Sequence, residues 1–320
     1  MSPAVIPDGL DPEVRRFVQA VNGAYARHTG GRKVSNAEAR RIAEEVRAPW
    51  RQGGPAMHAT TEHNVPVAGA SARIRIYDPA PTEPKAAMIY LHGGGWTLFS
   101  LDTHDRLMRE YAYRASIAVV GVDYPLSPEA KFPLALDQLV EVVGWLRSHG
   151  AALGIDPARL AIGGDSAGAN LALAAVLKLR DAGLPNATQA LLLNYGAFDT
   201  RCSDESARRY GGPDYMLTRE EMAMFWGNYL RGPGDERDPL ACPMHARFEG
   251  LPPVFLTIPE CDILTEQSQE MAKRMRSTGV DVTARVYAGA THSFLEAMSI
   301  SHAAGRAIDD ASAWLKEALE

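Results

Sequence analysis

The chain has 320 residues, 46% hydrophobic and 22% charged, which is typical of a globular protein able to bury a sheet on both faces. The formal net charge is −6 and no block of lysine and arginine stands out, so we expect no nucleic-acid partner. No basic segment followed by an apolar run opens the sequence, and no stretch approaches the roughly 18 apolar residues of a membrane span. We therefore expect a cytoplasmic protein with no membrane insertion.

The cysteines Cys202, Cys242 and Cys261 are an odd number in a long chain, which favours free thiols in a reducing compartment. Cys242 lies close to His245, but no second pair at metal-ligand spacing follows. The sequence therefore predicts no metal site.

Residues 1–55 have the pattern of polar helices. The Asp-Pro-Glu sequence at 11–13 is typical of a helix start, and apolar residues over 14–21 then recur at helical spacing. The Ser-Asn-Ala-Glu sequence at 35–38 has the spacing of a capping box for a second helix that continues through residue 46.

The pattern then changes to strands that alternate with helices. Residues 65–76 alternate between apolar and polar across a turn at 68–70, which predicts an antiparallel hairpin. Short apolar runs at 86–90 and 117–122 are typical of strands buried on both faces. Further strands are expected over 160–162, 190–193, 254–258 and 280–286, and helices over 133–149, 169–179 and around Trp314. This order predicts an α/β fold with a mostly parallel central sheet and helices on both faces.

One segment interrupts this alternation. Residues 218–221 (Thr-Arg-Glu-Glu) form a capping-box pattern, and an aromatic, methionine-bearing helix follows it. Because this insertion separates two sheet strands, we expect it to cover the mouth of the sheet together with the N-terminal helices. The chain is thus divided into an N-terminal cap part, a first core part, a cap insertion and a second core part, at 1–55, 56–199, 200–247 and 248–320.

The sequence Gly-Asp-Ser-Ala-Gly at 164–168 has the Gly-x-Ser-x-Gly pattern between a predicted strand and a predicted helix. This sharp turn projects the hydroxyl of Ser166 away from the backbone, as a nucleophile requires. The N–H of Ala167, at the start of the helix, is expected to point at a developing oxyanion. The alternative reading is a glycine-rich turn with a chance serine, which the strand-turn-helix context disfavours.

His-Gly-Gly-Gly-Trp at 92–96 directly follows a predicted buried strand. Consecutive glycines allow backbone N–H groups to point inward without side chains in the way, as in the oxyanion loops of lipases and esterases. We expect Gly93, Gly94 and Ala167 to be the three donors.

A serine nucleophile needs a base, and the base needs an orienting acid. In folds that carry a Gly-x-Ser-x-Gly turn between a strand and a helix, the acid and then the histidine follow the serine in the chain. Of the histidines, only His292 has that order together with a position just after a predicted strand. Asp262 has the corresponding position for the acid, with Glu260 as a nearby rival.

These motifs, together with Asp123-Tyr-Pro-Leu-Ser-Pro-Glu129, resemble the bacterial hormone-sensitive-lipase-like esterases, which are α/β-hydrolases. The resemblance extends from about residue 60 to the C-terminus. It implies a Ser166–Asp262–His292 triad, a helical cap, and no metal or organic cofactor. It also implies hydrolysis of small-molecule esters with short to medium acyl chains, and suggests a homodimer.

Three positions depart from the family pattern: Ile263 and Gly196, where proline is common, and Phe99, where glycine is frequent. Phe99 is expected to reshape the pocket beside the oxyanion loop. The cap's aromatic and methionine side chains either pack the cap onto the core or line the pocket. We expect substrate contacts from Trp96, Phe99, Tyr195, Met216, Phe225 and Trp226.

Two rival functions remain open at this stage. An amidase, a natural-product deacetylase or an acyltransferase would use the same acyl-enzyme, so the motifs do not separate them from an esterase. A non-catalytic small-molecule receptor on this fold would normally lack a triad residue, and none is missing here.

Overall fold

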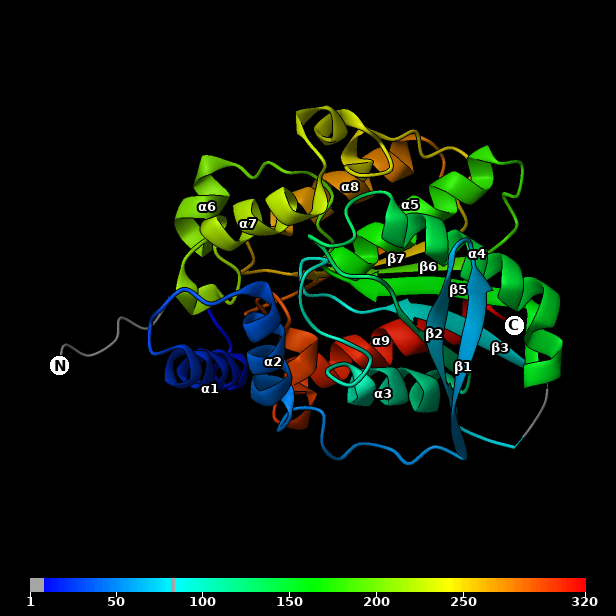
Figure 1. The fold of residues 1–320 in the computed structure, drawn as a ribbon, viewed down its shortest axis with the longest axis horizontal. Helices are drawn as coiled ribbons and strands as arrows, with labels where there is room; N and C mark the ends of the chain where they lie inside the picture. Colours follow the sequence, from blue (N-terminus) through cyan, green and yellow to red (C-terminus); the bar gives the residue numbers. More distant parts are fainter. Residues whose placement is uncertain (1–8, 82–83) are drawn as a thin grey trace.

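An eight-stranded sheet with the order β1-β2-β4-β3-β5-β6-β7-β8 forms the centre of the computed structural model, which describes residues 9–81 and 84–320 (Figure 1). Strand β2 pairs antiparallel with both β1 and β4, and every other neighbouring pair is parallel. The strands are β1 Ala59–Val67, β2 Ala70–Asp78, β3 Lys85–Leu91, β4 Ala118–Asp123, β5 Ile155–Asp165, β6 Ala190–Asn194, β7 Val254–Pro259 and β8 Val282–Tyr287. The predicted mostly parallel sheet is confirmed.

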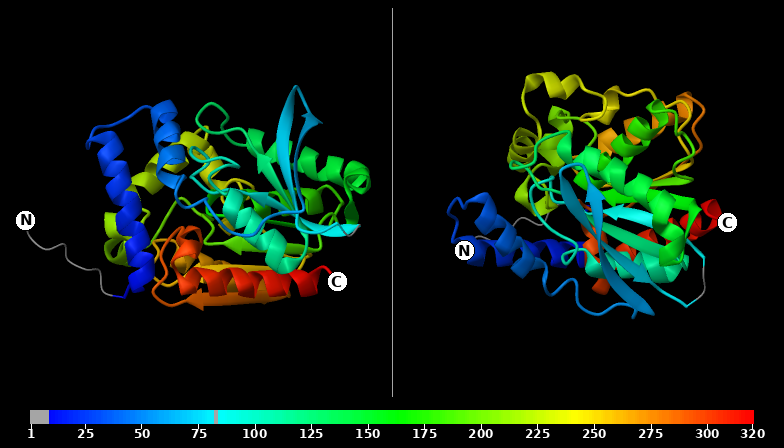
Figure 2. Two further views of the ribbon diagram at one scale, coloured as in Figure 1. Left: turned by 90° about the horizontal axis from the view of Figure 1, so that it is seen from below. Right: turned by 45° about the vertical axis from the view of Figure 1, so that its right-hand side comes forward.

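Helices cover both faces of this sheet (Figures 1 and 2). One buried cluster joins α4, α5 and α8 to the sheet, and a second joins α1, α3 and α9 to its other face. The α-helices are α1 Pro12–Thr29, α2 Asn36–Arg47, α3 Asp105–Ala115, α4 Leu134–His149, α5 Ala167–Asp181, α6 Asp204–Tyr210, α7 Arg219–Tyr229, α8 Thr265–Ser277 and α9 His302–Ala318. Helices α3, α6 and α8 were absent from the sequence prediction. No helix in the described part of the chain is long and apolar enough to cross a membrane.

The helix starts follow their capping residues. Asp11 accepts hydrogen bonds from the N–H groups of the first turn of α1, and Thr218 and Glu221 form a complete capping box at α7. At α2 the predicted capping box is only half formed. Ser35 accepts from the N–H of Glu38, but the Glu38 carboxylate pairs with Arg32 at 2.5 Å instead of returning to the backbone.

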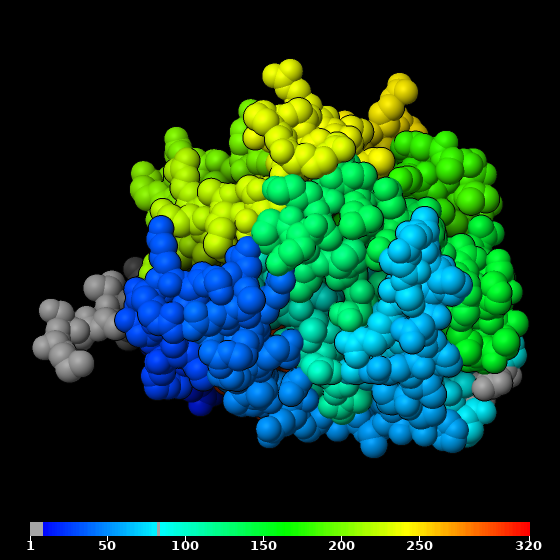
Figure 3. Space-filling model, viewed as in Figure 1, coloured from blue at the N-terminus to red at the C-terminus, as the bar shows by residue number. Residues whose placement is uncertain are grey.

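The N-terminal helices lie near the insertion between β6 and β7. Helices α6 and α7 lie between β6 and β7 in the chain, and in Figure 3 the blue N-terminal residues adjoin the yellow-green insertion. Asn22 of α1 donates a hydrogen bond to the carbonyl of Pro213 at 2.6 Å. This contact agrees with a cap built from both segments, although the four-part division itself stays a prediction.

The central strands of the sheet are more deeply buried than the edge strand β8. All seven residues of β3 are buried, as expected for a parallel strand covered on both faces. At the edge, β8 keeps the predicted apolar positions, but Val286 is 53% exposed. The alternating apolar residues that predicted β8 therefore do not all lie on a buried face of the sheet.

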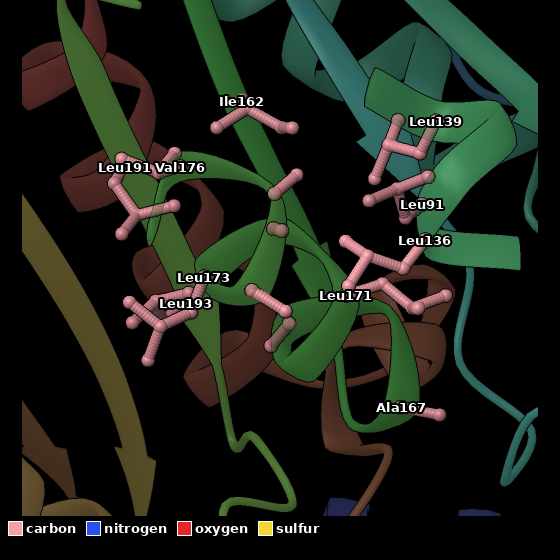
Figure 4. Close-up of a cluster of buried hydrophobic side chains, with 14 of the residues drawn as sticks. Leu91, Leu136, Leu139, Ile162, Ala167, Leu171, Leu173, Val176, Leu191 and Leu193 are labelled. Atoms are coloured by element: carbon pink, nitrogen blue, oxygen red, sulfur yellow. The ribbon is translucent and has the colours of Figure 1, made fainter. Parts of the chain in front are cut away.

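We predict that Ile162→Ala, in the centre of β5, lowers the free energy of unfolding by about 2–5 kcal/mol. Ile162 is fully buried in the cluster between the sheet and helices α4 and α5 (Figure 4), so the deletion leaves a cavity. Val286→Ala on the exposed edge is the control and should change stability by no more than about 0.5 kcal/mol. Denaturant unfolding midpoints measure both changes, and equal effects would contradict the assignment of the core.

Candidate active site

Ser166 occupies a strained turn between β5 and α5. Its backbone has φ 55° and ψ −116°, a region that side-chain-bearing residues rarely adopt. A Cβ added to Gly168 would lie 1.9 Å from the carbonyl oxygen of Leu91, and one added to Gly164 would lie 2.5 Å from the same atom. Both glycines are therefore required by the close approach of β3.

The hydroxyl of Ser166 contacts a histidine that an aspartate orients. Oγ of Ser166 lies 2.9 Å from Nε2 of His292, and Nδ1 of the same ring lies 2.7 Å from Oδ2 of Asp262. Asp262 is fully buried after β7, and its Oδ1 accepts from the N–H of Leu264 at 3.0 Å. The rival Glu260 is exposed and accepts from the N–H of Gly289 instead. The structure therefore brings together the three residues singled out in the sequence.

Opposing effects set the proton affinity of His292. Burial lowers its pKa, but the charge of Asp262 and the hydrogen bond to it raise it, and the net result lies above the ordinary value of 6.5. The carboxylates of Asp165 and Glu296 raise the pKa further. Its environment therefore favours the imidazolium that forms when a base accepts a proton.

The glycine loop presents free backbone donors, with a shift of one residue from the predicted set. Gly94 and Gly95 line the cavity beside Ser166 and Ala167, whereas Gly93 does not. Within the described residues, the N–H groups of Gly94, Gly95 and Ala167 have no protein acceptor. A Cβ on Gly93 would instead meet Oδ2 of Asp165 at 2.4 Å, so Gly93 faces the interior.

Asp165 joins the serine turn to the surrounding core. Its buried carboxylate accepts from the hydroxyl of Tyr90 at 2.9 Å, and Nε2 of His104 lies 3.3 Å away. Burial raises the pKa of Asp165, but the charge of His104 and these hydrogen bonds outweigh it and hold that pKa below its usual range. The expectation that Asp165 is a structural residue agrees with these contacts. His104 drew no attention in the sequence because it precedes the nucleophile.

A cavity of about 620 Å³ opens over Ser166 and His292. Of the residues expected to contact substrate, five line it: Trp96, Phe99, Met216, Phe225 and Trp226. The expectation for Tyr195 is wrong, because this fully buried side chain packs edge-on against the His292 ring at 5.1 Å and does not line the cavity. It lies behind the base rather than beside the substrate.

The N-terminal helices contribute a wall that the sequence did not predict residue by residue. Tyr25 of α1 and Ala39 and Arg47 of α2 line the cavity, together with Lys33 between the two helices. Their periodicity predicted helices, but only the tertiary placement of those helices brings these side chains to the cavity. In the described part of the chain, no cluster of three or more His, Cys, Asp or Glu side chains is arranged to hold a metal ion.

Comparisons with known proteins agree with this geometry. A family model described as the α/β-hydrolase fold matches residues 88–296. An acetyl esterase of Salmonella enteritidis is 35% identical over 263 residues, covering 82% of this chain and 80% of the relative. This chain belongs to the hormone-sensitive-lipase-like esterases of the α/β-hydrolase family. The predicted fold, family and enzyme class of a carboxylic-ester hydrolase are confirmed.

Solved structures resemble this esterase over nearly its whole length. A hyperthermophilic esterase from the archaeon Pyrobaculum calidifontis superimposes with a TM-score of 0.90 at 30% identity, covering 97% of this chain and 98% of that one. A thermostable carboxylesterase cloned from a metagenomic library has a TM-score of 0.86 at 32% identity, covering 90% and 98%.

The departures from the family pattern affect this esterase differently. Gly196 lies against Phe198, where an added Cβ would meet the ring at 2.2 Å. Ile263 is buried beside Asp262 and helps fill the core. Phe99 has a positive φ of 72° and lines the cavity, as expected for a residue that shapes the pocket.

We predict that kcat/KM of this esterase rises with pH along a limb whose midpoint lies above 6.5, because His292 must be neutral to accept a proton. Asp262→Asn removes the charge that raises this pKa, so the midpoint should move to lower pH. The rate should fall by roughly 10³–10⁴-fold, because the imidazole loses its orienting acceptor. An unchanged midpoint in the variant would contradict the electrostatic coupling of the pair.

The Asp165 carboxylate holds the serine turn against the core. Asp165→Asn removes the charge between His104 and the serine turn, and we expect kcat to fall about 10- to 100-fold through misplacement of the nucleophile. Asp156→Asn, at the opposite end of β5, is the matched control and should leave kcat within about twofold. Steady-state kinetics on one ester compares them, and equal losses would show that any acid on this strand has the same effect.

Proposed function

We propose that this esterase hydrolyses small-molecule esters with short to medium acyl chains, with Ser166 as nucleophile, His292 as base and Asp262 as orienting acid. The observation that carries the proposal is the continuous contact from Oγ of Ser166 through His292 to Asp262, at 2.9 and 2.7 Å. Nucleophile, base and acid within hydrogen-bond reach are the geometric signature of nucleophilic acyl transfer.

The proposed reaction has two steps. His292 accepts the proton of Ser166 as Oγ bonds to the ester carbonyl carbon, and then gives that proton to the departing alcohol as the C–O bond breaks. In the second step His292 accepts a proton from water, and the resulting hydroxide oxygen displaces Ser166 from the acyl group. Ser166 recovers its proton from His292, so the enzyme returns to its starting state with an acid and an alcohol released.

For the oxyanion we propose the N–H groups of Gly94, Gly95 and Ala167, in place of the set that begins at Gly93. Their place along the cavity supports this choice, since Gly93 does not line it and faces Asp165 instead. Ala167 is the first residue of α5, so the helix dipole adds to its N–H. Loss of one such donor typically costs about 10²–10³ in turnover.

The acyl-length proposal rests on the cavity and on a relative. A volume of about 620 Å³ with mostly apolar and aromatic walls accommodates a small ester. The Salmonella relative is named an acetyl esterase, which supports activity at the short end of the range.

We expect Ser166→Ala to lose hydrolysis of p-nitrophenyl esters from acetyl to decanoyl by roughly 10⁴–10⁶-fold, because the acyl-enzyme cannot form. Wild-type kcat/KM should be highest for acetyl to hexanoyl esters. Undiminished hydrolysis by the alanine variant would refute the nucleophile. In the same assay, Glu260→Gln should retain nearly full activity, since its carboxylate holds only the backbone of Gly289.

A further inference from the structure

A buried ion pair lies in the wall of the cavity, apart from the residues of the proposed mechanism. Nε of Arg47, the last residue of α2, lies 2.7 Å from Oε2 of Glu296, and the two side chains are 3% and 5% exposed. Glu296 belongs to the short 3-10 helix Phe294–Ser299, which follows His292. The wall of the cavity is thus fastened to the loop of the proposed base.

An aromatic ring positions the same guanidinium against the glycine loop. The Arg47 guanidinium lies 4.9 Å from the centre of the Phe99 ring, within cation–π range. The Phe99 ring in turn packs on the loop, since a Cβ added to Gly94 would meet its Cδ2 at 2.7 Å. Arg47 therefore lies between the glycine loop and the loop of His292, and it lines the cavity that contains Ser166.

The charges are in contact, but the pair leaves its hydrogen-bonding groups unsatisfied. The N–H at Nε is not directed at the carboxylate. As a result, Nε and Nη1 of Arg47 and both carboxylate oxygens of Glu296 are buried without a hydrogen-bond partner in the described chain. Buried donors without acceptors are costly and rare in native proteins, and because Arg47 lines the cavity, an acceptor on a ligand bound there would lower that cost.

We propose that Arg47 is a specificity-determining residue that donates a hydrogen bond to an uncharged oxygen of the substrate, other than the scissile carbonyl. The inference rests on the proposed function. Arg47 and Glu296 already neutralise one another, so a substrate carboxylate would leave a net negative charge buried beside Glu296. An ether, hydroxyl or second carbonyl oxygen satisfies the donor without adding charge.

The oxygen belongs to either the acyl or the alcohol part of the ester, and isosteric substrate pairs distinguish these sources. The acyl pair is p-nitrophenyl methoxyacetate and p-nitrophenyl butyrate, which differ by one oxygen in place of a methylene. The alcohol pair is 2-methoxyethyl acetate and butyl acetate. For each pair the measured quantity is the ratio of kcat/KM for the oxygen-containing ester to that for its alkyl counterpart.

The test variant is Arg47→Met with Glu296→Gln, which removes both charges and strands neither. We expect its ratio to fall about tenfold relative to wild type for one of the two pairs, the effect of one hydrogen bond to a charged donor. Comparing ratios cancels the different intrinsic reactivities of the esters. The pair that changes identifies the part of the substrate that Arg47 contacts.

Lys33→Met is the matched control, because it removes a positive charge from the same cavity at an exposed residue with no described ion-pair partner. It should leave both ratios within about twofold. If Lys33→Met lowers a ratio as much as the double variant does, the effect is a general field and the proposal fails. Unchanged ratios in the double variant also overturn it, since water then suffices as the acceptor.

Two further measurements separate this proposal from other failures. Arg47→Lys keeps the charge but not the planar donor fork, so its ratio of kcat/KM values should fall severalfold. This variant tests the proposal if the double variant does not fold. If the double variant does not fold, an unchanged ratio in Arg47→Lys overturns the proposal. If wild-type hydrolysis does not depend on Ser166, the proposed function fails, whereas ratios insensitive to Arg47 in a Ser166-dependent enzyme refute this inference alone.

Discussion

The turn at Ser166 is the constraint on which the rest of the site depends. A residue with a side chain at φ 55° is held there because β5 enters and α5 leaves against the carbonyl of Leu91, with no space for a Cβ at Gly164 or Gly168. The approach that excludes those side chains also brings the end of β3 beside the nucleophile. Because the glycine loop begins where β3 ends, its free N–H groups and that of Ala167 face one cavity.

Charge around the nucleophile is arranged in buried pairs. His292 with Asp262, His104 with Asp165, and Arg47 with Glu296 each place an acid against a base at nearly zero exposure. All three acids raise the pKa of His292, so carboxylates beyond its own aspartate also favour the imidazolium. The two outer acids are paired locally, which limits this effect, and among the described residues Asp262 is the only carboxylate in direct contact with the His292 ring.

Local chemistry made much of this site predictable. The serine turn, the glycine loop and the capping box at α7 each depend on residues adjacent in the chain, and the structure contains them. The acid and the base are distant in the chain, but each follows a predicted strand, and their order after the serine identified them. Helix α3 was missed although Leu107, Met108, Tyr111 and Ala112 give it a buried stripe at helical spacing. Tyr195 was misplaced because position in a strand-end loop does not tell which way a ring turns. The N-terminal wall could not be predicted, because helical periodicity does not specify where a helix docks.

The same contrast between local and tertiary placement bears on the proposed substrate preference of this esterase. Residues that perform the proposed chemistry lie at strand ends of the core, where the backbone fixes them. Arg47 and Phe99 lie where a docked helix meets the glycine loop, so their geometry depends on packing between distant segments. Because Glu296 joins that contact to the loop of His292, we expect a change in the wall to affect the base as well. We therefore expect an exchange of the wall that preserves turnover to keep the Arg47–Glu296 charges balanced.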